Sequence, residues 1–170
     1  MFHFLFPDYR FESITQIHRK WLKEHEIYTM LLDVDCTLKY YRSKTLLPEV
    51  AVWLDRKKQQ GFHFCLFSNG RKGRIRRLAD ELDLPFYAPA FKPFPSGCRK
   101  AMRSLYLDPQ YTAVIGDQIF TDVVAANLAG IRSILVKPLR PYEEPLFTQI
   151  KRPFEKLVLY FDPHKRRQPD

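Results

Sequence analysis

Several features that would narrow the function are missing from this 170-residue chain. Its three cysteines, Cys36, Cys65 and Cys98, are scattered and form no CxxC pair, which argues against a disulfide framework or a zinc site and favours a reducing compartment. No run approaches the roughly 18 apolar residues that a membrane-spanning helix needs. Residues 1–7 lack the basic start and the long apolar stretch of a signal peptide. We therefore expect no transmembrane segment and no export signal.

The composition is that of a globular protein with an unusual charge balance. Apolar residues make up 45% and charged residues 28% of the chain, which is ordinary for one folded domain. Aromatic residues reach 15%, and the formal net charge is +9. A basic balance favours anionic partners such as phosphates, nucleic acid or an anionic membrane surface. A merely solubilising surface charge is the structural alternative.

Apolar runs alternate along the chain with amphipathic helical patterns. We expect strands over residues 28–32, 62–67, 85–88, 111–115 and 131–136. We expect helices over residues 11–25, 48–60, 71–82, 96–105, 120–129 and 146–161, the last interrupted near Pro153. This alternation predicts an α/β fold of three layers, with a Rossmann-like parallel sheet of about five strands and helices on both faces.

One domain over residues 1–170 is expected. Its core spans about residues 28–136, after an irregular lead and a helix in residues 1–27. Residues 137–170 would form the closing helix and a basic tail from His164 onward. Only about 30 residues separate Asp35 from Ser68, and 22 lie between Asn69 and Lys92. Neither gap has room for a cap domain, so we expect an open site.

Two carboxylates, Asp33 and Asp35, follow the first buried strand. Residues at i and i+2 of an extended chain leave on the same side, and ligands of open α/β sheets bind at the carboxyl ends of strands. A hard cation such as Mg²⁺ would relieve the repulsion between the two carboxylates. One of them can then act as a nucleophile while the other moves a proton. A simple Asx-rich turn is the alternative for this stretch taken alone.

Further polar groups follow the other strands. Ser68 and Asn69 can donate hydrogen bonds to a phosphoryl oxygen, and Lys92 adds a positive charge in a Pro-rich loop. Asp117 follows a later strand, with Asp122 close behind it. Each of these residues alone is typical of a turn, a cap or an exposed loop. Together they form the set that phosphoryl transfer needs: a nucleophile, a proton carrier, cation ligands and positive groups.

The spacing of these residues resembles the four motifs of the haloacid dehalogenase superfamily of phosphatases. The motifs are Asp33-Val-Asp35-Cys-Thr37-Leu38, Ser68-Asn69, Lys92-Pro93 and Gly116-Asp117-Gln-Ile-Phe-Thr-Asp122. More narrowly, the run 116–123 with Asn127, Gly130, Thr148, Arg152 and Glu155 is similar to the capless, YqeG-type branch, which is related to phosphatidylglycerophosphate phosphatases. The resemblance covers about residues 28–136, together with these late positions.

This resemblance implies a role for each motif residue. Asp33 would form an aspartyl-phosphate, and Asp35 would protonate the leaving oxygen and then activate water. Thr37, Ser68 and Asn69 would contact the phosphoryl group, and Lys92 would stabilise its charge. Mg²⁺ would be held by Asp33, by Asp35 through its main-chain carbonyl and by Asp117, with Asp122 supporting the ion directly or through water.

Two positions depart from this branch. Cys36 stands where the branch usually has Asn, and Lys151 where it often has Asn. Neither change removes a group that the chemistry requires. We interpret Cys36 as a small packing residue.

The resemblance implies a Mg²⁺-dependent phosphomonoesterase of the cytoplasm, with phosphatidylglycerophosphate as the best single substrate hypothesis. Basic residues of the loop at Lys39, Arg42 and Lys44 and of the helix 71–77 fit an anionic lipid phosphate at the inner membrane face. Packing of the Phe-rich N-terminus against the domain is favoured over contact with lipid. Alternative substrates are a nucleic-acid end, a phosphoprotein or a soluble metabolite. The alternative outside the enzymes is a basic binding module for RNA or the ribosome with little catalysis.

Overall fold

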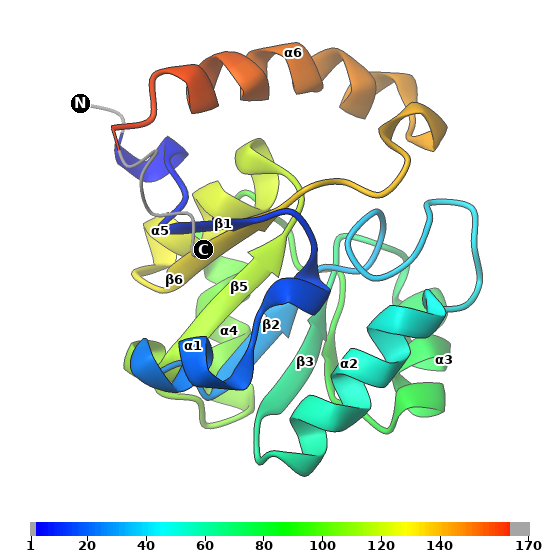
Figure 1. Cartoon of the computed structure of the whole chain (residues 1–170). Helices are drawn as coiled ribbons and strands as arrows, with labels where there is room; N and C mark the ends of the chain where they lie inside the picture. Colours follow the sequence, from blue (N-terminus) through cyan, green and yellow to red (C-terminus); the bar gives the residue numbers. More distant parts are fainter. Residues whose placement is uncertain (1–2, 164–170) are drawn as a thin grey trace.

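A computed structural model describes residues 3–163 and contains one parallel sheet between two layers of helices (Figure 1). The sheet order is β1-β6-β5-β2-β3-β4, with every neighbouring pair parallel. The strands are β1 (Tyr9–Phe11), β2 (Thr29–Leu32), β3 (His63–Phe67), β4 (Phe86–Tyr87), β5 (Thr112–Gly116) and β6 (Arg132–Val136). The predicted α/β fold with a Rossmann-like parallel sheet is confirmed.

Six α-helices and several short helical turns connect these strands. The helices are α1 (Arg19–Glu24), α2 (Pro48–Gln59), α3 (Lys72–Leu82), α4 (Pro95–Ser104), α5 (Val124–Ala129) and α6 (Leu146–Tyr160). The short turns of 3₁₀ type are η1 (His3–Leu5), η2 (Ile14–Gln16), η3 (Pro109–Tyr111) and η5 (Pro141–Glu143), and η4 (Ile119–Val123) is a π-helical turn. Within the described residues, only α2 lies between β2 and β3, so the expected absence of a cap insertion agrees with the structure.

The two faces of the sheet carry separate apolar clusters because successive strand residues point to opposite sides. On one face, Met30 and Leu32 of β2 pack with buried residues of α1, α2 and α3. On the other face, Leu31 packs with buried residues of α4 and α5. Each strand residue of β2 from Met30 to Leu32 is fully buried, as expected for a central parallel strand.

Three parts of the N-terminal and C-terminal regions differ from the prediction. Tyr9–Phe11 forms a sixth strand, where we expected an irregular lead and the start of a helix. The helix expected over residues 11–25 is split into η2 and the shorter α1. Conversely, α6 continues through Pro153, where an interruption was expected. A proline removes one main-chain hydrogen bond from a helix, and α6 is also held by apolar contacts of Val158 and Leu159 with the domain.

The N-terminal segment packs against the domain over its described part. Asn127 donates hydrogen bonds from Nδ2 to the carbonyl oxygens of Phe4 (3.0 Å) and Phe6 (2.8 Å), and Leu5 packs against the cluster that supports α6. This agrees with the packing that the sequence favoured for this segment. The predicted basic tail, residues 164–170, lies outside the described residues.

Helix α4 approaches the loop before Lys92 so closely that residue 97 must be glycine. A Cβ atom at Gly97 would collide with the main-chain carbonyl oxygen of Ala90, whereas a Cβ at Gly73 in α3 would meet nothing within 4 Å. We expect Gly97→Ala to lower the free energy of unfolding by about 1–3 kcal/mol, the usual cost of overpacking. Gly73→Ala should leave stability unchanged or raise it, since alanine favours helices. Urea unfolding of both variants measures the difference, and equal stabilities would contradict the close packing.

Candidate active site

The site lies at the carboxyl edge of the sheet, where the chain order reverses between β2 and β5, which is where open α/β sheets bind ligands. Asp33 follows β2 directly, and its Oδ1 accepts a hydrogen bond from the Lys92 Nζ at 2.6 Å. The same Nζ donates to Asp122 Oδ1 at 2.6 Å and to the Phe67 carbonyl oxygen at 3.0 Å. Lys92 is 6% exposed, so this buried ammonium joins two buried carboxylates.

Lys92 is held in place through its main chain by Asn69. The Asn69 side chain donates to the Lys92 carbonyl oxygen and accepts from the Lys92 amide, both at 2.8 Å. The sequence predicts that this amide contacts a phosphoryl oxygen; the bond to Lys92 uses one of the two hydrogens on Nδ2, so the other stays available for that contact. Ser68 Oγ accepts from the Gly70 amide at 3.1 Å, so its hydroxyl hydrogen stays available for another acceptor.

Asp122 reaches the site because Gly116 leaves room for it. A Cβ atom at Gly116 would collide with the Asp122 carboxyl group. Asp122 Oδ2 also accepts from the Gln118 amide at 3.0 Å, which fixes the carboxylate within the turn η4. The glycine that ends β5 therefore has a steric function at the site.

Asp117 follows β5 and lies between groups from two other elements. The Thr37 Oγ1 donates to Asp117 Oδ1 at 3.0 Å and lies 3.5 Å from Asp33 Oδ2. On its other side, the Arg152 guanidinium of α6 pairs with Asp117 Oδ2 and donates to its carbonyl oxygen at 2.7 Å. Asp117 is therefore tied both to the loop after β2 and to the last helix of the described chain.

Arg152 is the centre of a second ion-pair network. Its guanidinium contacts Glu144 at 2.5 Å and Glu155 at 3.0 Å, and both carboxylates are 5% exposed. Glu155 Oε1 in turn accepts from the Ile119 amide at 2.7 Å. The sequence pattern predicts no such network: Arg152 and Glu155 enter only through the family resemblance, and no signal in the sequence indicates Glu144.

Asp35 has different surroundings from Asp33, because β2 ends at Leu32 and the alternation of an extended strand does not continue past it. Its carboxylate pairs with Lys39 at 2.7 Å and with Arg74 at 2.5 Å. Lys39 is 3% exposed. The assignment of Lys39 to an exposed basic loop for lipid phosphates was therefore wrong, since its ammonium is enclosed by Asp35 and main-chain carbonyl oxygens.

The environments of these carboxylates shift their pKa values in different directions. Burial raises the pKa of Asp33 to about 7, with Lys92 opposing the rise and Asp122 adding to it. Burial also raises the pKa of Asp117 well above its usual range, although Arg152 opposes it. For Asp35, burial alone would raise the pKa, but hydrogen bonds from Arg74 and Lys39 outweigh burial and lower it.

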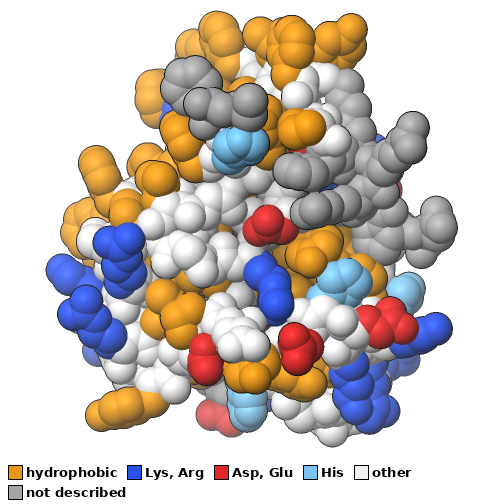
Figure 2. Space-filling view, turned by 90° about the vertical axis from the view of Figure 1, so that its left-hand side faces the viewer, with side chains coloured by type: hydrophobic (Ala, Val, Ile, Leu, Met, Phe, Trp, Pro, Cys, Tyr) orange, Lys and Arg blue, Asp and Glu red, His pale blue; other side chains and the backbone are white. Residues whose placement is uncertain are grey.

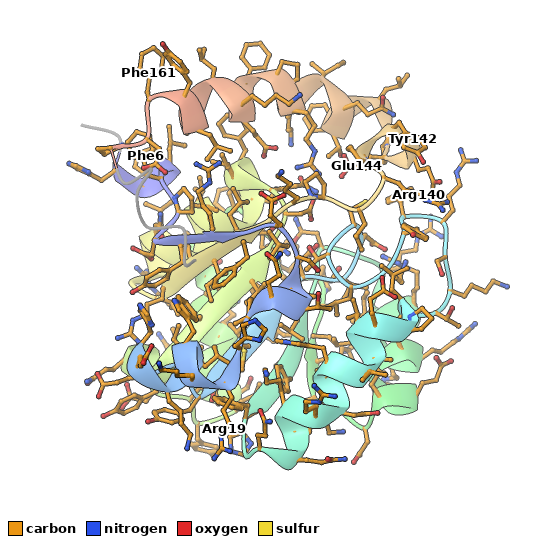
Figure 3. The ribbon with its side chains drawn as sticks, viewed as in Figure 1. Phe6, Arg19, Arg140, Tyr142, Glu144 and Phe161 are labelled. Atoms are coloured by element: carbon orange, nitrogen blue, oxygen red, sulfur yellow. The ribbon has the colours of Figure 1, made fainter. Side chains whose placement is uncertain are left out.

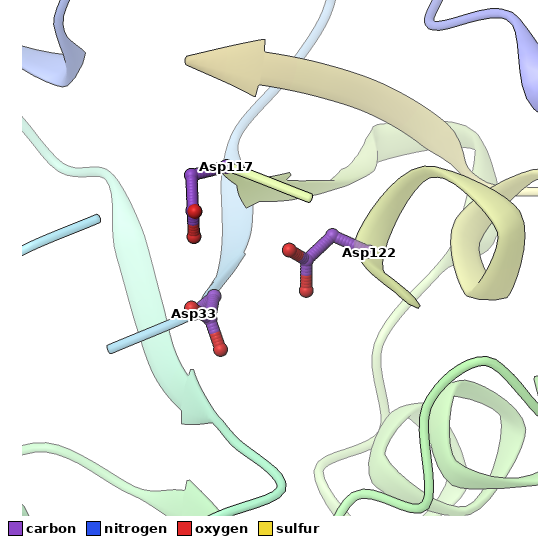
Figure 4. Close-up of side chains that lie close together, drawn as sticks. All are labelled: Asp33, Asp117 and Asp122. Carbon is purple, nitrogen blue, oxygen red and sulfur yellow. The ribbon is translucent and has the colours of Figure 1, made fainter. Parts of the chain in front are cut away.

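Three of the carboxylates are suited to share a cation. Oxygen atoms of Asp33, Asp117 and Asp122 all lie within 4.8 Å of one another (Figure 4). Oxygen-only donors of this kind match the preference of hard divalent cations. The Asp35 carboxylate is not in this group, and coordination by its main-chain carbonyl stays a prediction.

The candidate site opens into a cavity of about 310 Å³. The side chains that line it come from every predicted motif and from α6. They are Asp33, Asp35, Ser68, Asn69, Lys92, Gln118, Thr121, Thr148 and Lys151, with Cys36, Tyr41, Arg74 and Glu144 also in the wall. Figure 3 shows Glu144 in the segment that leads into α6 and Phe161 at the far end of that helix. One side of the site is thus formed by α6, which the prediction of an open edge did not include.

Cys36 is 1% exposed and adopts a positive φ of 63°. Burial raises the pKa of its thiol, which keeps the sulfur protonated. These surroundings agree with our interpretation of Cys36 as a packing residue, since a reactive cysteine needs thiolate character.

Comparison with known proteins agrees with this geometry. A family model described as HAD-hydrolase-like matches residues 90–138. Probable phosphatase YqeG of Bacillus subtilis (strain 168) is 30% identical over 156 residues, spanning 92% of this chain and 90% of that protein. The chain therefore belongs to the haloacid dehalogenase (HAD) superfamily of phosphatases. Within that superfamily its relative YqeG represents the branch that the motifs of the sequence indicated.

Solved structures share the fold. The 3-deoxy-D-manno-octulosonate 8-phosphate phosphatase of Moraxella catarrhalis, determined with magnesium, phosphate and KDO, aligns with a TM-score of 0.54 at 17% identity over 85% of this chain and 94% of that chain. The cobalt-bound YrbI phosphatase of Haemophilus influenzae aligns with a TM-score of 0.53 at 16% identity over 84% and 97% of the two chains.

Across residues 3–163, no helix has the length and apolarity to span a bilayer.

The Arg152 network predicts a large and pH-dependent loss of stability for Arg152→Met. The variant leaves three buried carboxylates without their shared cation, and removing one member of a buried pair costs about 3–5 kcal/mol. Burial already raises the pKa of Glu155, and loss of the guanidinium raises it further. The folded variant then binds more protons than the unfolded chain, so its stability increases as the pH falls.

Urea unfolding at several pH values measures this effect. Arg103→Met is the matched control, because Arg103 is exposed on α4, and surface substitutions change stability by about 0.5 kcal/mol or less. An Arg152→Met variant as stable as this control, or one whose deficit grows on acidification, would contradict the role given to Arg152.

Proposed function

We propose that the chain is a Mg²⁺-dependent phosphomonoesterase that forms an aspartyl-phosphate on Asp33. The observation that carries the proposal is the position of this carboxylate. It lies at the switch point of the sheet, 2.6 Å from the Lys92 ammonium, and its oxygens lie within 4.8 Å of those of Asp117 and Asp122. Membership of the HAD phosphatases supports the same reaction class.

In the first step, a carboxylate oxygen of Asp33 attacks phosphorus and the bond from phosphorus to the alcohol oxygen breaks. Asp35 gives its proton to the departing oxygen. In the second step, the Asp35 carboxylate takes a proton from water, whose oxygen attacks the aspartyl-phosphate and releases inorganic phosphate and free Asp33. In this proposal the Lys92 ammonium and the Thr37 and Ser68 hydroxyls stabilise the phosphoryl oxygens.

The metal would be held by Asp33 and Asp117, with Asp122 beside them and Asp35 contributing its main-chain carbonyl. When bound, Mg²⁺ supplies positive charge that offsets the charge of the phosphoryl group and the carboxylates. The oxygen-only donor set fits this ion. The Moraxella phosphatase of the same fold was determined with magnesium, which supports the choice of ion.

For the substrate we propose an anionic lipid phosphate, with phosphatidylglycerophosphate as the first candidate. Exposed basic residues of the loop after β2 and of α3 with the residue before it support an anionic substrate, namely Arg42, Lys44, Arg71, Lys72, Arg76 and Arg77. A nucleic-acid end, a phosphoprotein or a soluble phosphate ester would use the same chemistry. The pure binding module is disfavoured, since binding alone has no use for Asp33, Lys92 and Asp117 in this arrangement.

We expect Mg²⁺-dependent phosphate release from a generic aryl phosphate, and release from phosphatidylglycerophosphate in mixed micelles. Asp33→Asn should lower both activities by about a thousandfold or more, since it removes the nucleophile. Asp55→Asn, an exposed position on α2, is the control and should keep wild-type activity. Rapid acid quenching with radiolabelled substrate should trap labelled protein in the wild type and not in Asp33→Asn.

Activity only on soluble esters would retain the reaction and reject the lipid substrate. A folded wild-type protein with no activity on any ester would reject the phosphatase itself. Full activity in Asp33→Asn would reject Asp33 as the nucleophile.

The pairing of Arg74 with Asp35 predicts a shift in the pH profile. Hydrogen bonds from Arg74 and Lys39 lower the pKa of Asp35, so Arg74→Gln should raise that pKa. A general acid with a higher pKa stays protonated to a higher pH, and the descending limb of kcat/KM should therefore move to higher pH. Arg77→Gln, exposed on the same helix, should leave the limb in place. An unmoved limb in Arg74→Gln would argue against Asp35 as the acid.

A further inference from the structure

The outer face of α6 is apolar and exposed. Side chains on this face are between 55% and 77% exposed, and they are Leu146, Phe147, Ile150, Phe154, Leu157 and Phe161. At about 100° per residue, they form a single stripe about 100° wide along the helix. Figure 2 shows hydrophobic side chains gathered at the top of the molecule, where α6 lies in Figure 1. Single exposed apolar residues are common, but a contiguous group of them marks an interaction surface.

The opposite face of α6 already holds the helix on the domain. Arg152 and Glu155 form the buried ion pairs described above, and Val158 and Leu159 pack on the cluster formed by Ile119, Val123 and Leu135. Turning the helix to bury the outer stripe would expose these paired charges and lose their contacts. The outer face is therefore a second apolar surface of α6, separate from the face that packs on the domain.

The charges beside the stripe are basic. At helical spacing, Lys151 lies along one border and Lys156 along the other, and the Lys151 ammonium is 4.1 Å from the centre of the Phe147 ring. The only acidic residue of α6, Glu155, is buried. The sequence after the helix adds Lys165, Arg166 and Arg167, against Asp162 and Asp170. An apolar stripe bordered by lysines is the pattern of helices that lie in the interface of anionic membranes.

We propose that the outer face of α6 is a docking surface for an anionic lipid bilayer, with the helix lying in the plane of the interface. The phenyl and aliphatic side chains would enter the boundary between headgroups and acyl chains, and Lys151 and Lys156 would reach the lipid phosphates. A second copy of the chain fits less well. Two α6 helices packed face to face would bring these lysines together, and α6 exposes no acidic side chain to offset them.

Docking through this face would bring the active site close to the lipid. Thr148 and Lys151 of α6 line the site cavity, and a helix with its side chains is about 10 Å across. The cavity would therefore lie about one helix diameter from the membrane surface. This consequence for catalysis depends on the proposed function, whereas the binding to membranes does not.

Vesicle flotation tests the docking surface. The full chain is mixed with vesicles of phosphatidylcholine alone or of phosphatidylcholine with phosphatidylglycerol. We expect binding to the anionic vesicles only, weakened by high salt. The double variant Phe154→Gln with Leu157→Gln should bind about tenfold or more weakly, since it removes two apolar anchors. Lys156→Glu should weaken binding to anionic vesicles as well.

The matched control is Val52→Gln with Leu128→Gln, which removes two exposed apolar side chains from α2 and α5. This control should bind vesicles like the wild type. All variants should unfold at the wild-type temperature and hydrolyse a soluble aryl phosphate at the wild-type rate. Loss of that hydrolysis in every protein, with vesicle binding intact, would reject the proposed function and leave the docking surface standing.

Three results would overturn the docking surface. The first is a wild-type chain that does not float with anionic vesicles. The second is a Phe154→Gln, Leu157→Gln variant that floats like the control. The third is a stable dimer, seen by sedimentation velocity, that persists with vesicles present and that this variant dissociates, because the face would then bind a second copy of the chain.

Discussion

Buried negative charge at the carboxyl edge of the sheet exceeds the positive charge that the protein places beside it. Asp33, Asp117, Asp122, Glu144 and Glu155 are all less than 9% exposed, and they share the ammonium of Lys92 and the guanidinium of Arg152. Burying carboxylates is costly unless cations or donors compensate them. Much of the local structure therefore positions the Lys92 ammonium and the Arg152 guanidinium. A bound divalent cation would offset the remaining negative charge of the carboxylates.

Each cation depends on a different part of the chain. Asn69, after β3, fixes the main chain of Lys92. Arg152 arrives from α6, the last helix of the described chain, and it fixes that helix to Asp117. The same helix exposes its apolar face on the opposite side. Contact of a membrane with the outer face of α6 would thus act on a helix whose Arg152 is bound directly to Asp117.

The sequence predicted the parts of the site that local pattern specifies. The apolar run before Asp33 identified β2, and the polar residues after later strands placed Ser68, Lys92 and Asp117 at one edge. The ion pair of Arg152 with Asp117 joins residues 35 positions apart, and no periodicity indicates such a pair. Lys39 occupies a polar loop, so nothing in the sequence suggested that its ammonium would be buried. The three residues of β1 are too few to give a strand pattern.

The protein shifts the pKa values of the two carboxylates of the first motif, Asp33 and Asp35, in opposite directions. The pKa of Asp33 is raised to about 7, which disfavours the anion that a nucleophile needs. The pKa of Asp35 is lowered, which disfavours the protonated form that a general acid needs. In the proposed reaction, the substrate and the cation act on both pKa values.

In the proposed reaction, binding of the cation and of the substrate would reverse both tendencies. A cation held by Asp117 and Asp33 favours the anionic form of Asp33. A phosphoryl group in the cavity attracts Arg74, which lines the same cavity, and a weakened pair with Arg74 lets the pKa of Asp35 rise. The nucleophile and the acid would then reach their working protonation states only when metal and substrate are both present. This coupling would give the Arg74–Asp35 pair a second function in the proposed reaction, besides lowering the pKa of Asp35.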